Sequence, residues 1–343
     1  MKYYSRIVVV TFCVFAGFAV FYTISSFSNV TFKDSDEEQE FNRKGYLQPR
    51  TTRYGDPLSQ VERFILILII SAPYNTDKRQ AIRQTWLSLL ANNSVALGPS
   101  NVRRMKDPTN ASVSLVIHYW FVCGHDEKYN VEHALDNESQ VYGDILRLGY
   151  TEKYSLLTYK TLSSLGFAST MDVKFVVKVD DDVYLHVPRL IWWLKNASLP
   201  EKLYAGRLFE HGRAIREKYH KWYVSEQYFN ETYLPPYCNG PFYILSKNVV
   251  VELLKASSGG RLTWFPLEDA FIGILAKRLG IKPFAIVEGL LLSHTLSRAW
   301  PEKILENYSL NQFFALGHDL SAPQLFEIHE RFLSLPLFMP LEF

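Results

Sequence analysis

Three consecutive aspartates, Asp180, Asp181 and Asp182, follow the mainly apolar run Phe175–Val179. The aromatic and β-branched residues of this run predict a buried strand that ends at the carboxylates. Like charges gathered at a strand end inside a domain repel one another unless a cation offsets them. Mg²⁺ and Mn²⁺ prefer carboxylate oxygens, and ligands of open α/β sheets bind beyond the carboxyl ends of the strands. The triplet therefore predicts a metal site that holds a diphosphate, with a solvated acidic turn as the plain alternative.

A second acidic pair, Glu268-Asp269, stands directly before the apolar run Ala270–Ala276. Acidic residues at the start of a helix complement its dipole, which would explain the pair without any chemistry. A carboxylate shielded by aromatic neighbours such as Trp264 and Phe265 can instead have a raised pKa. Such a group can accept a proton from a sugar hydroxyl as a general base.

Basic residues mark the start of the helix predicted over 78–90. Arg79 and Arg83 are four positions apart and share a helix face, where they could receive phosphate oxygens. An exposed surface face is the alternative interpretation. The preceding segment, Ser71–Asp77, matches neither a P-loop nor a G-x-G-x-x-G motif, which argues against an ATPase and against a dinucleotide dehydrogenase.

His294 and the segment Tyr237-Cys-Asn-Gly240 are weaker signals. A single histidine near an apolar run is more often structural, but the predicted metal site could use His294 as a further ligand. The segment Tyr237–Gly240 is a turn signal between aromatic stretches. It could border a sugar, whose pyranose ring stacks on aromatic faces, or it could pack in the core.

Strand-forming runs alternate with helical patterns along the chain. The seven apolar residues Phe64–Ile70 predict a strand that is buried on both faces, as in a parallel sheet. The alternation indicates an α/β domain with a mostly parallel central sheet, in which a nucleotide-binding half precedes a half that shapes an acceptor site. The other predicted strands are 114–122, 175–184, 241–246 and 283–287, and the other predicted helices are 132–142, 154–167, 188–194, 247–254 and 268–279.

The N-terminal segment Ile7–Ile24 carries no charged residue. Its length is near the lower limit of about 17–25 residues for a membrane-spanning helix. Basic residues precede it and acidic residues follow it, which predicts a cytosolic tail at 1–6, a signal-anchor at 7–24 and a lumenal stem at 25–60. A cleaved signal peptide is the alternative, and it would leave the main domain in the same compartment.

The overall composition narrows the function classes. The chain has 343 residues, of which 48% are hydrophobic, so a substantial core is expected. A net charge of +2 without a dense basic run argues against a nucleic-acid partner. With 3 cysteines the chain is no disulfide scaffold, and Cys123 and Cys238 could pair or remain thiols. Passage through the secretory pathway is indicated by Asn-x-Ser/Thr sequons at Asn29, Asn92, Asn110, Asn137, Asn196, Asn230 and Asn307.

Together these motifs resemble the β1,3-glycosyltransferases of glycosyltransferase family 31, which include β1,3-galactosyl- and β1,3-N-acetylglucosaminyltransferases. The resemblance implies a GT-A fold, a type II Golgi membrane topology, a UDP-sugar donor and a Mn²⁺ ion. It also implies inversion at the transferred sugar. The matching blocks follow the order of the family and are residues 79–86, 138–145, 154–160, 175–184, 237–240 and 268–273.

The resemblance also implies roles for the acidic residues at the matching positions. Asp182 is expected to contact the metal, and Asp180 and Asp181 are expected to hold the ribose and the sugar of the donor. Asp269 is expected to be the base that deprotonates the 3-hydroxyl of the acceptor.

Four further residues receive expected roles in the same way. Arg79, Arg83 and Trp86 are expected to frame the UDP pocket. His294 is expected to supply a further contact to the metal or the diphosphate.

The chain departs from the family pattern in places. The segment Ser169–Met171 stands where the family often has a cysteine, so a family disulfide is expected to be absent. Gly240–Tyr243 replaces a glycine-rich run and is expected to reshape the acceptor side. Ala270 replaces the usual valine after the Glu-Asp pair, a harmless core change. Both acidic sites are retained, which favours an active enzyme.

The leading expectation is a Golgi β1,3-hexosyltransferase with its catalytic domain at 61–325 and a C-terminal extension at 326–343. Galactose is the favoured sugar and N-acetylglucosamine the second. The expected partners are the UDP-sugar, a glycan acceptor on glycoprotein or glycolipid, and the membrane. One rival is a catalytically inactive sugar-binding Golgi membrane protein of the same fold, and another is an adhesion domain that binds a divalent ion.

Overall fold

The computed structural model describes residues 60–92, 101–110, 112–258, 265–292 and 310–335. The predicted cytosolic tail, the predicted span 7–24 and the predicted stem lie outside these ranges, except that Gln60, the last residue of the predicted stem, begins a strand. Within them, we find no helix of sufficient length and apolar character to cross a bilayer.

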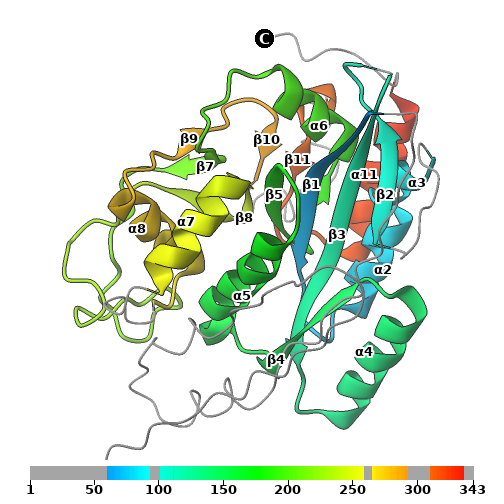
Figure 1. Cartoon of the computed structure of the whole chain (residues 1–343). Helices are drawn as coiled ribbons and strands as arrows, with labels where there is room; N and C mark the ends of the chain where they lie inside the picture. The colour runs from blue at the N-terminus through cyan, green and yellow to red at the C-terminus, as the bar shows by residue number, and fades with distance from the viewer. Residues whose placement is uncertain (1–59, 93–100, 111, 259–264, 293–309, 336–343) are drawn as a thin grey trace, which may run out of the picture.

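A mixed eight-stranded sheet forms the centre of the molecule, in the order β2-β3-β1-β5-β8-β7-β9 with β4 beside β3 (Figure 1). The neighbours of β1, namely β3 and β5, both run parallel to it, whereas β8 runs antiparallel to β5 and to β7. The strands are β1 Gln60–Ile70, β2 Val102–Lys106, β3 Val113–His125, β4 Ile145–Thr151, β5 Phe175–Asp180, β7 Tyr204–Phe209, β8 Tyr237–Ser246 and β9 Phe284–Ala285.

The prediction of an α/β fold is confirmed, but the sheet is mixed where a mostly parallel one was predicted. Besides the pairs of β1, β4 runs parallel to β3 and β9 parallel to β7, whereas β2 and β8 pair antiparallel with their neighbours. Helix α6 (Val187–Asn196) lies between β5 and β7 in the chain and allows these strands to point the same way. No helix is found in the connection from β7 to β8, residues 210–236, so the chain turns back. Strand β8 therefore enters between β5 and β7 in the opposite direction.

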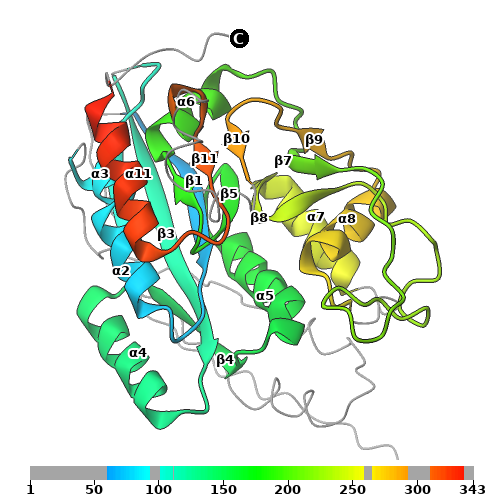
Figure 2. The same ribbon diagram turned by 180° about the vertical axis from the view of Figure 1, so that it is seen from behind.

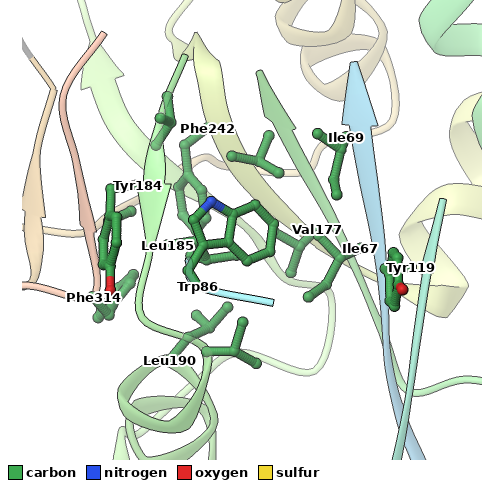
Figure 3. Packing of buried hydrophobic residues seen from close by; sticks show 14 of the residues in the cluster. Ile67, Ile69, Trp86, Tyr119, Val177, Tyr184, Leu185, Leu190, Phe242 and Phe314 are labelled. Atoms are coloured by element: carbon green, nitrogen blue, oxygen red, sulfur yellow. The ribbon is translucent and has the colours of Figure 1, made fainter. Parts of the chain in front are cut away.

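Two hydrophobic cores cover the two faces of the sheet because the side chains of β1 alternate. Ile65, Ile67 and Ile69 belong to one cluster and Leu66 and Leu68 to the other. Part of the first cluster is shown in Figure 3.

Figures 1 and 2 show the helices that cover these faces. On the side of the first cluster lie α2 (Thr76–Gln84), α3 (Ser88–Asn92), α6 and α11 (Ala322–Ser334), and on the other side lie α5 (Leu157–Thr170), α7 (Lys247–Ser257) and α8 (Glu268–Arg278). Helix α4 (Tyr129–Tyr142) connects β3 to β4.

The helix predicted over 78–90 is two helices, because the chain breaks at Thr85. The backbone of Thr85 leaves the helical region (φ −102°, ψ −105°), and its hydroxyl donates to the carbonyl oxygen of Ala81 at 2.7 Å. This side-chain bond competes with continuation of the helix.

A second, three-stranded sheet joins the last described segment, residues 310–335, to the strand that follows the aspartate triplet. Strand β11 (Ala315–Leu316) pairs with β6 (Tyr184–Leu185) on one side and with β10 (Leu290–Leu291) on the other. Helix α11 then buries Ile328 and Phe332 in the first core cluster. The predicted boundary at 325/326 therefore cuts through a helix that belongs to the domain.

Cys123 and Cys238 are both buried thiols and do not pair. Burial raises the pKa of Cys123 to about 11, so the thiol stays neutral at physiological pH. The fold rests on its core and not on this disulfide.

Candidate active site

The aspartate triplet lies where the two central parallel strands end. Asp180 is the last residue of β5 and pairs in register with Ile70, the last residue of β1. The N–H of Asp181 donates to the carbonyl oxygen of Ile70 at 3.1 Å. Because both strands end at one edge of the sheet, the loops that follow them meet there, as in other ligand sites of α/β sheets.

Asp180, Asp182 and His318 form a cluster in which one ligand atom of each residue lies within 4.8 Å of the others. The imidazole Nδ1 of His318 is 3.3 Å from Oδ1 of Asp182. Burial alone would lower the pKa of His318, but the hydrogen bond and charge of Asp182 raise it. Two carboxylates and one imidazole, all partly accessible, are a donor set that suits Mn²⁺. The residues present therefore fit the metal that the sequence predicts.

His318 was not among the predicted site residues, and a tight turn places it. Gly317 has φ of 93° and Asp319 has φ of 65°, and the N–H of Leu320 donates to the carbonyl oxygen of Asp182 at 3.2 Å. A glycine suits the first of these positions because an L side chain rarely adopts a positive φ. The pattern Gly-His-Asp after a short apolar run was the available signal. The predicted ligand His294 lies outside the described residues.

Asp181 points to a different neighbour than Asp180 and Asp182 do. Its Oδ2 accepts a hydrogen bond from Nδ2 of Asn75 at 2.8 Å, and Nζ of Lys78 is 3.6 Å from its Oδ1. Lys78 also lies 4.0 Å from Oδ2 of Asp182. The loop between β1 and α2 is thus fixed to the triplet, and Lys78 offsets part of its charge.

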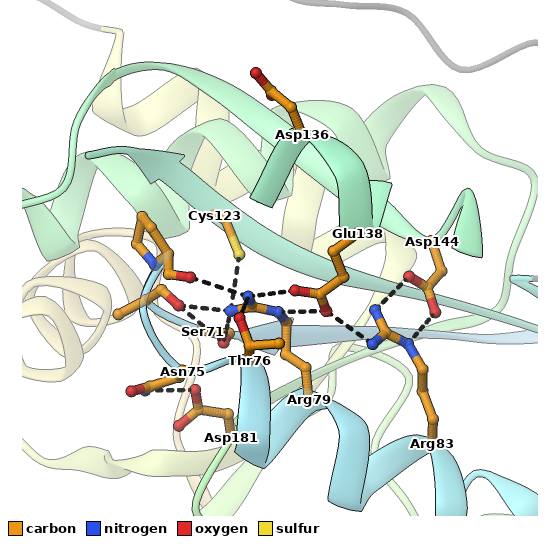
Figure 4. A network of polar contacts seen from close by, with 12 residues as sticks. Ser71, Asn75, Thr76, Arg79, Arg83, Cys123, Asp136, Glu138, Asp144 and Asp181 are labelled. Atoms are coloured by element: carbon orange, nitrogen blue, oxygen red, sulfur yellow. Dashed lines mark hydrogen bonds and ion pairs between the residues drawn. The ribbon is translucent and has the colours of Figure 1, made fainter. Parts of the chain in front are cut away.

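The side chain of Arg79 fixes the loop between β1 and α2 through hydrogen bonds (Figure 4). Its side chain has no exposed surface, and its guanidinium donates to both carboxylate oxygens of Glu138, at 2.9 and 2.6 Å. The same group donates to the carbonyl oxygens of Ala72 at 2.6 Å and Pro73 at 3.0 Å. Burial would raise the pKa of Glu138, but the hydrogen bonds and charges of Arg79 and Arg83 lower it, so the pair is ionised.

Arg83 continues the same network. It donates twice to Asp144, at 2.8 Å each, and once to Glu138 at 2.7 Å, while its guanidinium carbon lies 3.9 Å from the ring centroid of Tyr142. Trp86 is fully buried in the first core cluster (Figure 3). The structure therefore places Arg79 and Arg83 in an ion-pair network behind the loop that meets the triplet, and Trp86 in the hydrophobic core. Their predicted contact with UDP stays a prediction.

Asp269 lies in the first turn of α8 and faces β8. Its Oδ2 accepts from the N–H of Gly240 at 3.1 Å, and its Oδ1 accepts from the N–H of Ala270 at 2.8 Å. A Cβ atom at Gly240 would lie 3.3 Å from that Oδ2, so the glycine permits the close approach. Burial raises the pKa of Asp269, which suits a group that accepts a proton.

Glu268 turns away from Asp269 into the interior. The hydroxyl of Tyr243 donates to its Oε1 at 2.6 Å, and Nζ of Lys178 is 3.8 Å from its Oε2. Burial raises the pKa of Glu268 to about 7. Asp269, and not Glu268, is the member of the pair that stands beside the backbone at Gly240.

Aromatic side chains lie beside Asp269. Burial raises the pKa of the Tyr154 phenol, the polar neighbour Trp222 lowers it, and the negative charges of Asp269 and Asp180 raise it further. Tyr154 is 54% exposed and Trp222 is 44% exposed. Nζ of Lys221 lies 5.1 Å from the ring centroid of Tyr154. Large exposed aromatic faces next to a shielded carboxylate are suited to contact a sugar ring.

Comparison with known proteins shows one family. Residues 77–286 match the family described as galactosyltransferase. Beta-1,3-galactosyltransferase 1 of Homo sapiens is 30% identical over 224 residues, which are 64% of this chain and 62% of that protein. UDP-GlcNAc:betaGal beta-1,3-N-acetylglucosaminyltransferase 7 of Rattus norvegicus is 27% identical over 222 residues, 64% of this chain and 52% of that protein.

Similarity extends to plants and, weakly, to solved structures. Beta-1,3-galactosyltransferase GALT1 of Arabidopsis thaliana is 29% identical over 233 residues, 67% of this chain and 33% of that protein. The chain thus spans less than two thirds of the length of these relatives. A crystal structure of a glycosyltransferase involved in the glycosylation of the major capsid of PBCV-1 superposes with a TM-score of 0.40 at 11% identity, covering 78% of this chain and 99% of that chain.

Proposed function

This chain belongs to the galactosyltransferase family, and we propose that it is an inverting β1,3-hexosyltransferase. It would move galactose, or N-acetylglucosamine as the second choice, from a UDP-sugar to the 3-hydroxyl of a glycan acceptor. One observation carries the proposal. A cluster suited to Mn²⁺ at the end of β5 is linked to a shielded carboxylate with a raised pKa in the first turn of α8. The link runs through Lys178 and Gly240, which lie on the neighbouring strands β5 and β8.

Donor binding would use the residues at the ends of β1 and β5. Asp180, Asp182 and His318 would hold Mn²⁺, which supplies positive charge that offsets the diphosphate as UDP leaves. Asp181 fixes the loop that carries Asn75, as its hydrogen bond indicates. Arg79 keeps the same loop in place. It would therefore support the predicted UDP pocket without touching UDP itself.

Asp269 would act as the base. Its carboxylate accepts the proton of the acceptor 3-hydroxyl while the hydroxyl oxygen forms a bond to C1 of the donor sugar. The bond from C1 to the diphosphate oxygen breaks on the opposite face, and UDP leaves with the electron pair. A displacement of this kind inverts C1 and turns the α-linked donor into a β1,3-linked product. The raised pKa of Asp269 supports this role.

Tyr154 and Trp222 would form the acceptor side. Both present exposed aromatic surface, and Tyr154 lies within reach of the charge of Asp269, near which the sugar that carries the 3-hydroxyl must lie.

The finer features of the resemblance belong to the same proposal. We propose a GT-A fold and a type II topology in the Golgi membrane, with residues 7–24 as the anchor and the catalytic domain, including helix α11, in the lumen. Exposed sequon residues support passage through the secretory pathway, since Asn110, Asn137, Asn196 and Asn230 are all at the surface. The test is endoglycosidase treatment of the expressed ectodomain. If the treatment causes no shift in mass, the ectodomain carries no removable N-glycan, which would contradict this passage.

The function is tested by UDP release. The purified ectodomain is incubated with a panel of UDP-sugars and β-linked acceptors, with and without Mn²⁺, and products are identified by their linkage. We expect one donor sugar to be transferred in a β1,3 linkage in the presence of Mn²⁺ only. A folded ectodomain that binds sugars but transfers none would support the inactive sugar-binding alternative instead.

A further inference from the structure

A lysine lies in the middle of the most buried part of the sheet. Lys178 is the fourth residue of β5, and its neighbours in register are Leu68 on β1 and Tyr243 on β8. Its side chain is 1% exposed. A buried ammonium group is costly unless carboxylates and hydrogen-bond acceptors surround it, so its partners have to account for its presence.

The partners of Lys178 belong to both halves of the candidate site. Its Nζ lies 2.5 Å from Oδ1 of Asp180, which is two residues along the same strand and on the same face. It also donates to the carbonyl oxygen of Gly240 at 2.5 Å and lies 3.8 Å from Oε2 of Glu268. Burial would lower the pKa of Lys178, but Asp180 and Glu268 raise it, so the group stays charged.

Gly240 connects Lys178 to the proposed base, Asp269. Its carbonyl oxygen accepts from Lys178, and its own N–H donates to Oδ2 of Asp269 at 3.1 Å. Asp180 at the metal cluster and Asp269 at the acceptor side are therefore joined by one ammonium group and one backbone residue. Lys178 is buried and Gly240 is half-buried in the central sheet, where packed groups cannot shift without disturbing their neighbours.

We propose that Lys178 is a positioning residue that sets the separation between Asp180 and Asp269, acting on the base through Gly240. This inference rests on the proposed function, because the distance between Asp180 and Asp269 matters only if the two residues serve a sugar transfer reaction. A displacement needs its base and its leaving group in a fixed relation, and a misplacement of about 1 Å can lower a rate about a hundredfold. Lys178 would fix that relation without touching either substrate.

The test is a double-mutant cycle that pairs Lys178→Met with Asp269→Asn. If Lys178 acts through Asp269, we expect K178M alone to lower kcat at least about tenfold and to have less than about a threefold further effect in D269N. Single turnovers with radiolabelled donor measure the slow variants. Lys195→Met is the matched control, since Lys195 pairs with Glu62 and Asp107, near the start of β1 and the end of β2, whereas the site lies at the end of β1. It should lower the melting temperature and leave kcat within about twofold.

Gly240→Ala is the second variant, and it tests the proposal if K178M does not fold. It keeps Lys178 and places a methyl group 3.3 Å from Oδ2 of Asp269. We expect a loss of kcat that again disappears in the D269N background. Crystal structures of the variants provide a readout that does not depend on activity. The separation of the Asp180 and Asp269 carboxylates should change by more than about 0.5 Å, the tolerance of a productive site.

The outcomes separate the two proposals. Equal fold losses with and without Asp269, together with an unchanged carboxylate separation, would overturn the positioning role while the wild-type protein still transfers sugar. A wild-type protein that transfers no sugar from any UDP donor would instead overturn the proposed function.

Discussion

Nδ1 of His318 lies 3.3 Å from Oδ1 of Asp182, although 136 positions separate the two residues. The pairing of β6 with β11 brings them together, since β6 begins two residues after Asp182 and β11 ends two residues before His318. The candidate metal cluster is therefore built from two distant segments, and each of its members can be tested separately.

His318→Ala should weaken the Mn²⁺-dependent binding of UDP at least about tenfold, a loss seen even when supporting residues of a metal site are removed. Asp182→Ala should do the same and also cut turnover at least about a hundredfold. Titration calorimetry with UDP, with and without Mn²⁺, measures both. His133→Ala on the exposed face of α4 is the control and should bind as the wild type does. Unchanged affinity in H318A would remove His318 from the metal site.

Asp269→Asn should cut turnover at least about a hundredfold, because an amide cannot accept the proton that a positioned base removes. UDP affinity should stay within about threefold, since Asp269 has no place in the metal cluster. Steady-state kinetics and calorimetry on the same sample measure the two effects. Asp172→Asn, at an exposed ion pair with Arg63, is the control. Near-normal turnover in D269N would refute the role of the base.

The acid limb of the pH profile should show the raised pKa of Asp269. Burial favours the protonated form, so the carboxylate begins to take up its proton at a higher pH than an exposed aspartate does. Because the protonated group cannot act as a base, kcat/KM should fall as pH falls through this raised value. The profile of kcat/KM in buffers of constant ionic strength measures it. A limb at or below the usual pKa of about 3.9 would contradict the shielded base.

Trp222→Ala should raise the KM for the acceptor on the order of tenfold, the change that about 1.4 kcal/mol of lost contact energy produces. Because the contact is the same before and during transfer, kcat should change little. Transfer to water in the absence of acceptor should not change. Tyr219→Ala is a matched control, because Tyr219 is fully exposed in the same loop. An unchanged KM in W222A would place the acceptor elsewhere.

Glu138→Ala should lower the free energy of unfolding by about 3–5 kcal/mol, because it leaves the buried cations Arg79 and Arg83 without their shared partner. The pKa of Glu138 is lowered in the folded state, so its contribution is present above pH 4.5 and is lost as pH falls through the folded value. In the Glu138→Ala variant, the free energy of unfolding should lack the part that the wild type loses at acid pH. Urea unfolding at several pH values measures both effects, and Asp172→Ala at the exposed pair should change the free energy by no more than about 1 kcal/mol.

Local patterns of the sequence predicted much of the fold. The apolar run Phe64–Ile70 lies in β1 and is buried on both faces, and the triplet lies at the end of β5 as predicted. These predictions succeed because alternation, strand propensity and the position of charges are properties of neighbouring residues. The acidic pair at 268–269 likewise starts α8 as predicted.

The parts that were not predicted depend on distant partners. Arg79 and Arg83 have the pattern of an exposed helix face, yet Glu138 and Asp144, from α4 and the residue before β4, enclose them. The candidate metal ligand His318 requires the register of β11 against β6. Lys178 interrupts an apolar strand, which was a visible signal, but its meaning depends on Gly240 in a strand whose direction the sequence did not predict.

The pairing of β6 with β11 has a consequence for biosynthesis. While the ribosome is still translating residues before 315, the nascent domain already contains the aspartates but lacks the strand that covers β6 and the imidazole beside Asp182. Tyr184, whose ring centroid lies 5.1 Å from that of Phe332 in the finished protein, would remain uncovered until helix α11 emerges. A premature stop codon upstream of residue 315 would therefore yield a protein with an open sheet edge that chaperones retain, and not a weakened enzyme.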